Sequence, residues 1–456
     1  MSEKEINESK EILNEVKKNK SAVRKILEKH FQDKIVTNTK DFKNLQQPGG
    51  GASSSYIAER VTDNAIHIIK HAKISQGNTG EIQEKTDAIR EFIISPIYKR
   101  YLYDRTSTVE LLNDEQSQQD KDVFFIRSKF LDSYQTLNEW EGQNIVKTKP
   151  TVIITGEPAE ETDVHDNSIL AEKIQEVTGF EKVLAASLFN GEGDLNKNNI
   201  GIINNAELER SFAKIDHGRS FERFERNENG VREKILVDRE LYKYPYISPD
   251  ARKLNEHIEQ MLQVSDEEIE NIVANRIDVL EKLQIDPKGI ALNESHPSQQ
   301  STSIKENLNE LKKECISDLK SQKNVMREFA KTLKAVNLMQ PVSEQWLKGQ
   351  WLDDIKGEDP ILFAKNNGMT IDGKDPIQYG IENHMMDASI KYAIEKGSNI
   401  DNLHPILYAH NNNIQIDGKE PLKYAEDKEE SKSSQNMWIA IRKTMLRTSL
   451  LLIKLT

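Results

Sequence analysis

The spacing of apolar and polar residues divides the chain into a mixed first part and a helical second part. Short apolar runs bounded by polar, Gly or Pro residues predict strands at 56–58, 66–69, 123–131, 152–155, 200–203 and 212–215. Apolar residues at three- and four-residue spacing predict helices in the same part, over 81–103 and 167–189. Beyond Pro249 the strand signal ends, and helices are predicted over 252–262, 266–283 and 304–338.

These patterns predict an α+β protein built from five successive segments. Charged and apolar residues alternate at helical spacing near the start of the chain, and the Pro- and Gly-containing stretch at 47–51 ends that pattern. The polar stretch 293–303 has the composition of a loop or linker. The expected segments are an N-terminal helical segment (1–44), a mixed unit (45–250), a helical region that completes or extends it (251–340), a repeat region (341–430) and a basic amphipathic tail (431–456).

The region after Pro341 contains an internal repeat. Asp-Pro-Ile-Leu-Phe-Ala at 359–364 recurs as His-Pro-Ile-Leu-Tyr-Ala at 404–409, and the turn Ile-Asp-Gly-Lys at 371–374 recurs at 416–419. Self-similarity at a fixed offset is typical of stacked helical units, none of which buries its apolar face alone. The repeat region resembles degenerate ankyrin repeats, with an unrelated small helical repeat as the alternative.

Composition and charge narrow the classes of function. Charged residues make up 30% of the chain and the formal net charge is -12, which argues against broad nucleic-acid binding. The single Cys315 excludes an internal disulfide framework and a cysteine-rich zinc site. Residues 1–30 lack the apolar region of a signal peptide, and no run reaches the ~18 apolar residues that cross a bilayer. We expect no nucleic-acid partner and no membrane span.

Three polar residues in two short motifs are the strongest candidates for chemistry. Asp194 and Asn199 lie in one motif, and Asp216 lies in a Gly-containing turn shortly after it. Phosphoryl transfer requires metal ions fixed against a nucleotide and a residue that orients the acceptor hydroxyl. Asp194 is the candidate for the acceptor, and Asn199 and Asp216 are candidate metal ligands whose oxygen atoms suit Mg²⁺. Taken alone, the first motif is equally compatible with a polar surface turn.

These motifs resemble those of phosphatidylinositol 3- and 4-kinases. Gly-Asp-Leu-Asn-Lys-Asn-Asn-Ile at 193–200 resembles their catalytic loop Gly-Asp-Arg-His-x-x-Asn-Ile, and Ile-Asp-His-Gly at 215–218 resembles their Ile-Asp-Phe-Gly. The Gly- and Ser-rich run at 48–57 resembles the phosphate loop of the type II phosphatidylinositol 4-kinases. The resemblance spans residues 45–240 and implies a bilobal protein-kinase-like catalytic core, followed by an all-α region with ankyrin-like repeats.

The resemblance also implies an ATP site. Lys70 would be the nucleotide-binding lysine, with Lys73 as the competing choice, and Glu91 would pair with it from a helix. The strand at 124–131 would be the interlobe strand against which adenine stacks. The implied cofactors are ATP and Mg²⁺, with Mn²⁺ as the alternative cation. The remaining implied ATP-binding residues belong to the small-residue loop: Gly50, Gly51, Ser53, Ser54 and Ser55.

Two residues depart from the family pattern. Asn196 stands where the family has the catalytic-loop His, and because Asn cannot act as a base, Asp194 or a water would have to take that role. His217 stands where the family has Phe, behind the metal-binding turn. Loss of activity is therefore an alternative outcome.

A basic cluster after the Asp216 turn suggests an anionic substrate. Because Arg binds phosphate through paired hydrogen bonds, we expect this segment to bind the head group of phosphatidylinositol or its monophosphates. Glu residues between the basic ones leave a helix with internal ion pairs as the alternative. The candidate head-group residues are Lys197, Arg219, Arg223 and Arg226.

The chain most resembles the phosphatidylinositol 3-kinase-like effectors that intracellular bacteria, including rickettsiae, deliver into host cells. This resemblance implies a secreted phosphatidylinositol 3-kinase, or a 4-kinase, that alters vesicle trafficking from the host cytosol and the cytosolic face of host membranes. The tail 437–456 mixes Trp, Ile and Leu with Arg and Lys, which is typical of a helix on an anionic membrane or of a helix that caps the repeats. Two alternatives stay open: a protein Ser/Thr kinase, and a pseudokinase scaffold that binds a host protein through the ankyrin-like repeats.

Overall fold

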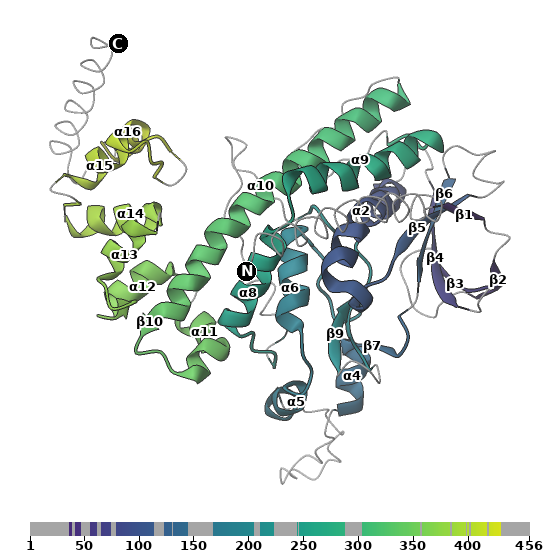
Figure 1. The fold of residues 1–456 in the computed structure, drawn as a ribbon, viewed down its shortest axis with the longest axis horizontal. Coiled ribbons are helices and arrows are strands. Elements are labelled where there is room, and N and C mark those ends of the chain that lie inside the picture. The colour runs from purple at the N-terminus through teal and green to yellow at the C-terminus, as the bar shows by residue number, and fades with distance from the viewer. Residues whose placement is uncertain are drawn as a thin grey trace, which may run out of the picture.

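The protein has a mixed α+β architecture, with two sheets in its first half and mainly helices in its second half (Figure 1). The computed structural model describes residues 36–38, 42–46, 55–61, 65–73, 79–113, 123–129, 131–144, 167–204, 210–222, 244, 246–287, 303–355, 358–383, 385–397, 399–400, 403–416 and 419–429. The predictions for residues 1–35, for a strand at 152–155 and for the tail 431–456 lie outside the described residues.

The larger sheet has six strands and is covered on one face by a long helix. Its first strand, β1, pairs in parallel with β5, and all other neighbouring strands of this sheet pair antiparallel. Helix α2 (Thr79–Leu102) packs against β4 and β5. In spatial order the strands are β1 (Val36–Asn38), β5 (Val109–Asn113), β6 (Val123–Lys129), β4 (Ile66–Lys73), β3 (Ser55–Arg60) and β2 (Phe42–Gln46).

The sheet begins earlier in the chain than the sequence pattern predicts. We expect a helical segment up to residue 44, and this prediction is wrong for residues 36–38 and 42–44, which belong to strands β1 and β2. Their backbone groups bond to β5 and β3, and such tertiary pairing overrides a weak helical propensity. Strand β5 is not predicted either, and its pairing with the distant strands β1 and β6 is what places it in the sheet.

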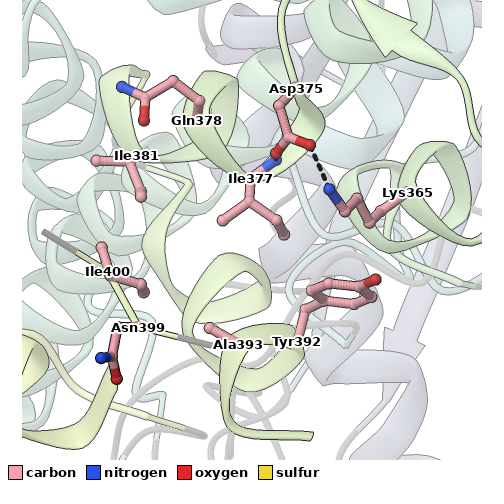
Figure 2. Close-up of a pocket in the computed structure, with 9 residues that line it drawn as sticks. All are labelled: Lys365, Asp375, Ile377, Gln378, Ile381, Tyr392, Ala393, Asn399 and Ile400. Carbon is pink, nitrogen blue, oxygen red and sulfur yellow. Dashed lines mark hydrogen bonds and ion pairs between the residues drawn. The ribbon is translucent and has the colours of Figure 1, made fainter. Parts of the chain in front are cut away.

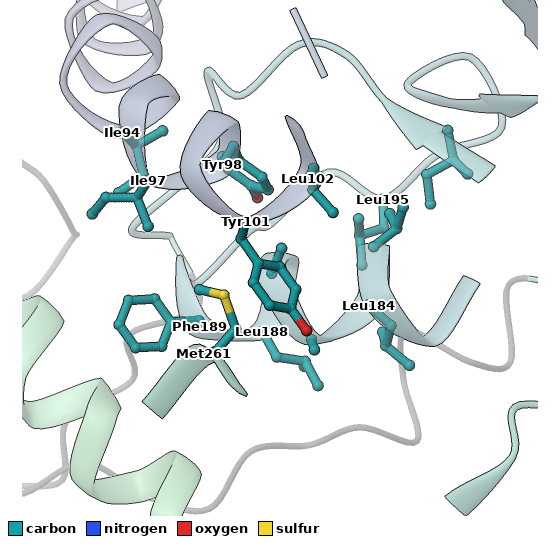
Figure 3. Close-up of a cluster of buried hydrophobic side chains, with 14 of the residues drawn as sticks. Ile94, Ile97, Tyr98, Tyr101, Leu102, Leu184, Leu188, Phe189, Leu195 and Met261 are labelled. Atoms are coloured by element: carbon teal, nitrogen blue, oxygen red, sulfur yellow. The ribbon is translucent and has the colours of Figure 1, made fainter. Parts of the chain in front are cut away.

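Helix α2 belongs to the main hydrophobic core. Phe92 and Ile93 have no exposed area, and Figure 3 shows Ile97 and Tyr101 of the same helix beside Phe189 and other apolar side chains of the chain's middle part. Because buried side chains hold α2 in place, this helix can fix the position of a candidate site residue that it carries, Glu91.

The smaller sheet lies next to two loops that carry candidate residues: the loop 193–199, with Asp194 and Asn199, and the turn 215–218, with Asp216. Its three antiparallel strands are β7 (Tyr134–Thr136), β8 (Ile200–Ile203) and β9 (Ser211–Lys214), and all residues of β8 and β9 are buried. Helix α4 (Leu137–Asn144) packs against β7 and β8, while α6 (Phe180–Phe189) packs against β9. Because β8 and β9 are bonded in register, the loop before β8 and the turn after β9 are brought to the same end of the sheet.

The helix predicted over 167–189 is interrupted in the structure. It forms α5 (Asn167–Ile174) and α6, and Gly179 between them has a φ of 86°, a conformation that favours glycine. The interruption arises because Thr178 uses its backbone for a parallel bridge with Ser211 of β9. That bridge anchors the smaller sheet to α6.

Three long helices complete the main body. Helices α8 (Ala251–Leu262), α9 (Asp266–Lys282) and α10 (Ile304–Leu338) confirm the predicted helices to within one residue at each end. Helix α8 begins at the N-cap Asp250 and α9 at the N-cap Ser265, whose side chains accept backbone hydrogen bonds. Among the described residues, no helix is both long enough and apolar enough to cross a membrane.

Short helices form an array at the far side of α10 from the sheets (Figure 1). In the region described between 358 and 429, each helix from α12 to α16 packs on the next, and an irregular turn η3 (Trp346–Gln350) with α11 (Trp351–Ile355) precedes them. Asp359, Asp375 and His404 cap their helices, each followed by Pro in the first turn. The five helices are α12 (Pro360–Asn366), α13 (Pro376–Glu382), α14 (Met386–Lys396), α15 (Pro405–Asn411) and α16 (Pro421–Glu429).

The array contains an open pocket. Figure 2 shows Ile377 of α13 toward Tyr392 of α14 and Ile381 on the side of Ile400, with an ion pair between Lys365 and Asp375 at one side. The repeated sequence corresponds to a repeated structure. Helices begin at Pro360 and Pro405, and the turns are closed by bridges between Ile371 and Lys374 and between Ile416 and Lys419. Whether these units belong to the ankyrin family stays a prediction.

Candidate active site

A solvent-open pocket separates the two sheets. The larger sheet and α2 form one side of it, and the smaller sheet with its two loops forms the other. Lys129 at the end of β6, Leu131, and Tyr134 at the start of β7 also line the pocket. The lining residues are Ile68, Lys70, Glu91, Ser107, Ser128, Lys129, Leu131, Tyr134, Asn199, Ile215 and Asp216.

Lys70 is the centre of the charged groups in this pocket. Its Nζ lies 2.7 Å from Glu91 Oε2 and 2.7 Å from Asp216 Oδ1. Burial lowers the pKa of Lys70, but the carboxylates of Asp216 and Glu91 outweigh this effect and raise it above the ordinary value. Lys70 therefore carries its full positive charge at neutral pH. The structure describes the backbone but not the side chain of the competing Lys73.

Glu91 holds Lys70 from the buried face of α2. Its side chain is only 1% exposed, and its Oε1 accepts a hydrogen bond of 3.2 Å from Ser128 Oγ on β6. Burial raises the pKa of Glu91, and the ammonium of Lys70 works against that rise. A helix, a central strand and its neighbour thus fix the position of the lysine.

Asp216 lies in a strained turn and faces the pocket. Its φ is 55°, an uncommon value for a residue with a side chain, and such strain is frequent at functional sites. The turn needs Gly218, because a Cβ there would lie 2.9 Å from Cβ of Asp87. Burial raises the pKa of Asp216, but the positive charges of Lys70 and Lys214 outweigh this effect and hold the pKa well below its usual range. The Asp216 side chain is ionised and keeps 41% of its area exposed.

Asp194 and Asn199 are in direct contact. Asn199 Nδ2 donates to Asp194 Oδ2 over 3.0 Å, and the Asn199 carbonyl accepts from the N–H of Ile215 over 2.9 Å. A second backbone bond of 2.8 Å runs from Gly193 N–H to the Arg219 carbonyl. These bonds join the two loops, so the structure brings together the three predicted residues Asp194, Asn199 and Asp216.

Asn196, which stands where the phosphatidylinositol kinases that the loop resembles have His, shapes the first loop. Its Nδ2 donates to Asp194 Oδ1 over 2.7 Å. Its Oδ1 accepts from the backbone N–H groups of Asn198 at 2.7 Å and Asn199 at 3.1 Å. Asn196 thus orients the Asp194 carboxylate and fixes the turn that carries Asn199, although it cannot accept a proton as His would.

An Asn196→Ala variant is expected to have a turnover rate about 10- to 100-fold lower than the wild-type protein, because small displacements of reacting groups cost this much. The change removes one hydrogen bond to Asp194 and two to the loop backbone. Steady-state rates of phosphoryl transfer from ATP measure the effect. Asn198→Ala is the matched control, since the Asn198 side chain is exposed and only its backbone N–H takes part. Equal rates in both variants would contradict the orienting role.

His217, the second departure from the family pattern, is fully buried behind the turn. Its ring stacks on Tyr98 with a centroid distance of 4.0 Å, and its Nε2 lies 2.8 Å from Thr106 Oγ1. Burial lowers the pKa of His217 well below its usual value, so the ring is neutral. A neutral stacked imidazole fills the apolar position that the family gives to Phe.

Two of the four basic residues predicted to bind a head group, Lys197 and Arg219, have acidic partners. Lys197 Nζ lies 2.5 Å from Glu141 Oε1, and Arg219 contacts Glu222. Arg223 and Arg226 lie outside the described residues, as do Gly50, Gly51, Ser53 and Ser54 of the small-residue loop. Ser55 begins β3, and its backbone is paired in register with Lys70.

Sequence reasoning missed the buried residues that hydrogen-bond to the site residues or to their backbone. Ser128, Glu192 and Lys214 are buried and bond to Glu91 or to the backbone of Asp194 and Asp216. Charged residues inside otherwise apolar stretches, such as Lys214 next to Phe212 and Ala213, are the signal that could have identified them.

The chemistry of the donor set fits a hard divalent cation. Asp216 offers an ionised carboxylate and Asn199 an amide oxygen, both at the wall of the pocket. Within the part of the chain that the structure describes, no three His, Cys, Asp or Glu side chains gather into a metal site. A cation here would therefore need further oxygen ligands, such as those of a nucleotide's phosphates.

Comparison with known proteins gives relatives in sequence and matches among solved structures. Residues 112–331 match the family model described as the LepB N-terminal domain. In the solved structures, the proinflammatory kinase CtkA of Helicobacter pylori aligns with a TM-score of 0.29 and 11% identity, over 64% of this chain and 99% of that one. A TM-score this low carries no weight for the fold.

Two similar curated proteins come from rickettsiae. Uncharacterized protein RC0188 of Rickettsia conorii is 30% identical over 392 residues, which cover 80% of this chain and 50% of the relative. Uncharacterized protein RP146 of Rickettsia prowazekii is 28% identical over 386 residues, which cover 79% of this chain and 57% of the relative. The chain thus spans about half the length of the curated relatives it matches, and its similarity is to rickettsial proteins.

Proposed function

We propose that this protein is an ATP- and Mg²⁺-dependent phosphotransferase with a kinase-type active site. One observation carries the proposal: Lys70 bridges Glu91 of α2 and Asp216 in a pocket that Asn199 also lines. A cation held in this way can bind nucleotide phosphates, and an ionised carboxylate beside an amide can hold the accompanying metal. The pocket between a larger sheet and a mainly helical part supports a bilobal arrangement.

The residues would act through position and charge rather than through covalent chemistry. In the nucleotide complex Lys70 would exchange its bond with Asp216 for phosphate oxygens while Glu91 keeps it in place. Asn199 and Asp216 would hold Mg²⁺, which supplies charge neutralisation at the phosphates when bound. The loop 193–199 would place Asp194 against the acceptor hydroxyl, and Asn196 would orient its carboxylate.

The proposed substrate is the inositol ring of phosphatidylinositol or its monophosphates. This assignment rests on the resemblance of the two loops to phosphatidylinositol 3- and 4-kinases and on the basic residues that follow Asp216. Lys197 and Arg219 lie at the edge of the two loops, and their acidic partners Glu141 and Glu222 would be displaced by a more highly charged phosphate. As a bacterial protein delivered into host cells, the chain would act at the cytosolic face of host membranes and alter vesicle trafficking.

The helical array supports a second role beside catalysis. Its open pocket between α13 and α14 exposes apolar and polar side chains of the kind that bind a partner protein. We propose that a host protein binds in this pocket, through the repeats that resemble ankyrin repeats. In a pseudokinase scaffold this would be the main function.

Incubation with radiolabelled ATP, Mg²⁺ and lipid vesicles tests the proposed function. Vesicles that contain phosphatidylinositol or its monophosphates should yield a labelled inositol lipid, and otherwise identical vesicles of phosphatidylcholine should not. Product identification by chromatography would tell a 3-kinase from a 4-kinase. Label on protein Ser or Thr with no labelled lipid would replace the lipid substrate by a protein. No label on either would reject the phosphotransferase.

A further inference from the structure

Two opposite charges are buried directly beneath the functional loops. Glu192 precedes the loop that carries Asp194, and Lys214 ends the strand before the Asp216 turn. Neither side chain has exposed area, and Lys214 Nζ lies 3.6 Å from Glu192 Oε2. Burial of two charges is costly, and the phosphotransferase mechanism described above uses neither of them.

Lys214 is bonded to the backbone of the strained turn. Its Nζ donates to the carbonyl oxygen of Ile215 over 2.9 Å and to that of Asp216 over 2.5 Å. Both carbonyls flank the residue whose φ is 55°. An ammonium group that binds two successive carbonyls keeps the peptide units in this orientation, and it therefore keeps the Asp216 carboxylate directed toward Lys70.

Glu192 is bonded to the backbone of the other loop. Its Oε1 accepts from the N–H of Asp194 over 3.1 Å, and its Oε2 accepts from Tyr98 Oη and Ser220 Oγ, each over 3.2 Å. One carboxylate thus contacts α2, the first loop and the segment after the turn. Burial raises the pKa of Glu192, while Lys214 and the hydrogen bonds favour its ionised form.

We propose that Glu192 and Lys214 are positioning residues, a buried ion pair that fixes the Asp194 loop and the Asp216 turn relative to each other. The proposal rests on the function proposed above, because it concerns the geometry of that site. Neither residue reaches the pocket. Their effect on transfer is exerted through Asp194 and Asp216.

A buried pair of this kind is poorly explained by stability alone. Well-packed apolar residues of similar volume often stabilise a protein as much as, or more than, a buried ion pair. The Glu192 and Lys214 side chains instead direct most of their hydrogen bonds to the backbone of the two functional loops. Groups that orient the ligands of a metal usually contribute about 10- to 100-fold to metal affinity or activity.

Lys214→Met in the full chain tests the inference, together with the double variant Glu192→Gln/Lys214→Met. The double variant leaves no unpaired buried charge, so it keeps the fold where the single variant fails to. We expect the double variant to need about 10- to 100-fold more Mg²⁺ for half-maximal transfer, or to show a kcat lower by that factor. Lys323→Met is the matched control, because Lys323 is an almost buried lysine paired with Asp266 at 2.8 Å, far along the chain from the site. It should leave the Mg²⁺ dependence unchanged.

Hydrogen exchange of the same variants gives a readout that does not depend on transfer. In the double variant, amides of residues 215–221 should exchange about tenfold faster than in the wild-type protein, while those of α8 and α10 keep their rates. Unchanged exchange at 215–221 would overturn the inference even if the protein had no kinase activity. If wild-type transfer is present, a double variant with both its Mg²⁺ dependence and its kcat unchanged would overturn it as well. Absence of transfer in the wild-type protein alone would instead reject the proposed function.

Discussion

The Asp216→Asn variant is expected to lose phosphoryl transfer by about 10³-fold or more while its fold persists. A metal at a transferring phosphoryl group contributes several kcal/mol, and each ~1.4 kcal/mol corresponds to a factor of ten. The change removes the charge of the carboxylate that lies 2.7 Å from Lys70 and keeps its size. Asn also tolerates the left-handed φ of 55° at this position, and its side-chain oxygen can still accept the bond from Gly218.

Asp372→Asn is a matched control for this experiment. Asp372 has a φ of 52°, close to the 55° of Asp216, but it lies in the helical array. Both variants should remain folded at the assay temperature, and only Asp216→Asn should lose the transfer of label from ATP. A rate above one-tenth of the wild-type value in Asp216→Asn would contradict the role of this carboxylate as the charged metal ligand beside Lys70.

Local patterns in the sequence carry much of the fold and the loops of the site. The strand Ile200–Ile203 and the helix Ile304–Leu338 are confirmed residue for residue, because each has a clear apolar pattern bounded by polar residues. Asp194 and Asn199 are only five positions apart, so a tight loop is enough to bring their side chains into contact. The proximity of Lys70 and Glu91 required the resemblance, because the two residues lie on different elements, β4 and α2, and no spacing rule joins them.

What the sequence could not predict depends on contacts between distant segments. Strands β1 and β5 form because they pair with each other, although they are more than seventy residues apart. The role of Glu192 depends on Tyr98, Lys214 and Ser220, and no pattern along the chain connects these residues. The break at Gly179 likewise follows from a bridge to Ser211. In each case a long-range partner decides what a local preference leaves open.

Lys70→Met is expected to lower kcat/KM for ATP by about 100-fold or more, because the cation that would bind the phosphates is lost. The same change should also lower stability, since Glu91 is only 1% exposed and would remain without its charged partner. Breaking a buried pair by removing one partner costs about 3–5 kcal/mol, and the 19% exposure of Lys70 places the expected loss at or below the lower end of that range. Urea unfolding measures this loss.

The double variant Lys70→Met/Glu91→Gln separates the two effects. Gln has nearly the shape of Glu and can still accept the hydrogen bond from Ser128, so the buried charge disappears without a cavity or an unsatisfied hydroxyl. Stability should therefore return most of the way to the wild-type value, whereas kcat/KM for ATP should stay as low as in the single variant. If activity recovered together with stability, Lys70 would be a structural partner of Glu91 rather than a nucleotide ligand. The kinase-type site would then lose the contact on which it depends, since Asn199 and Asp216 alone offer no positive charge to ATP.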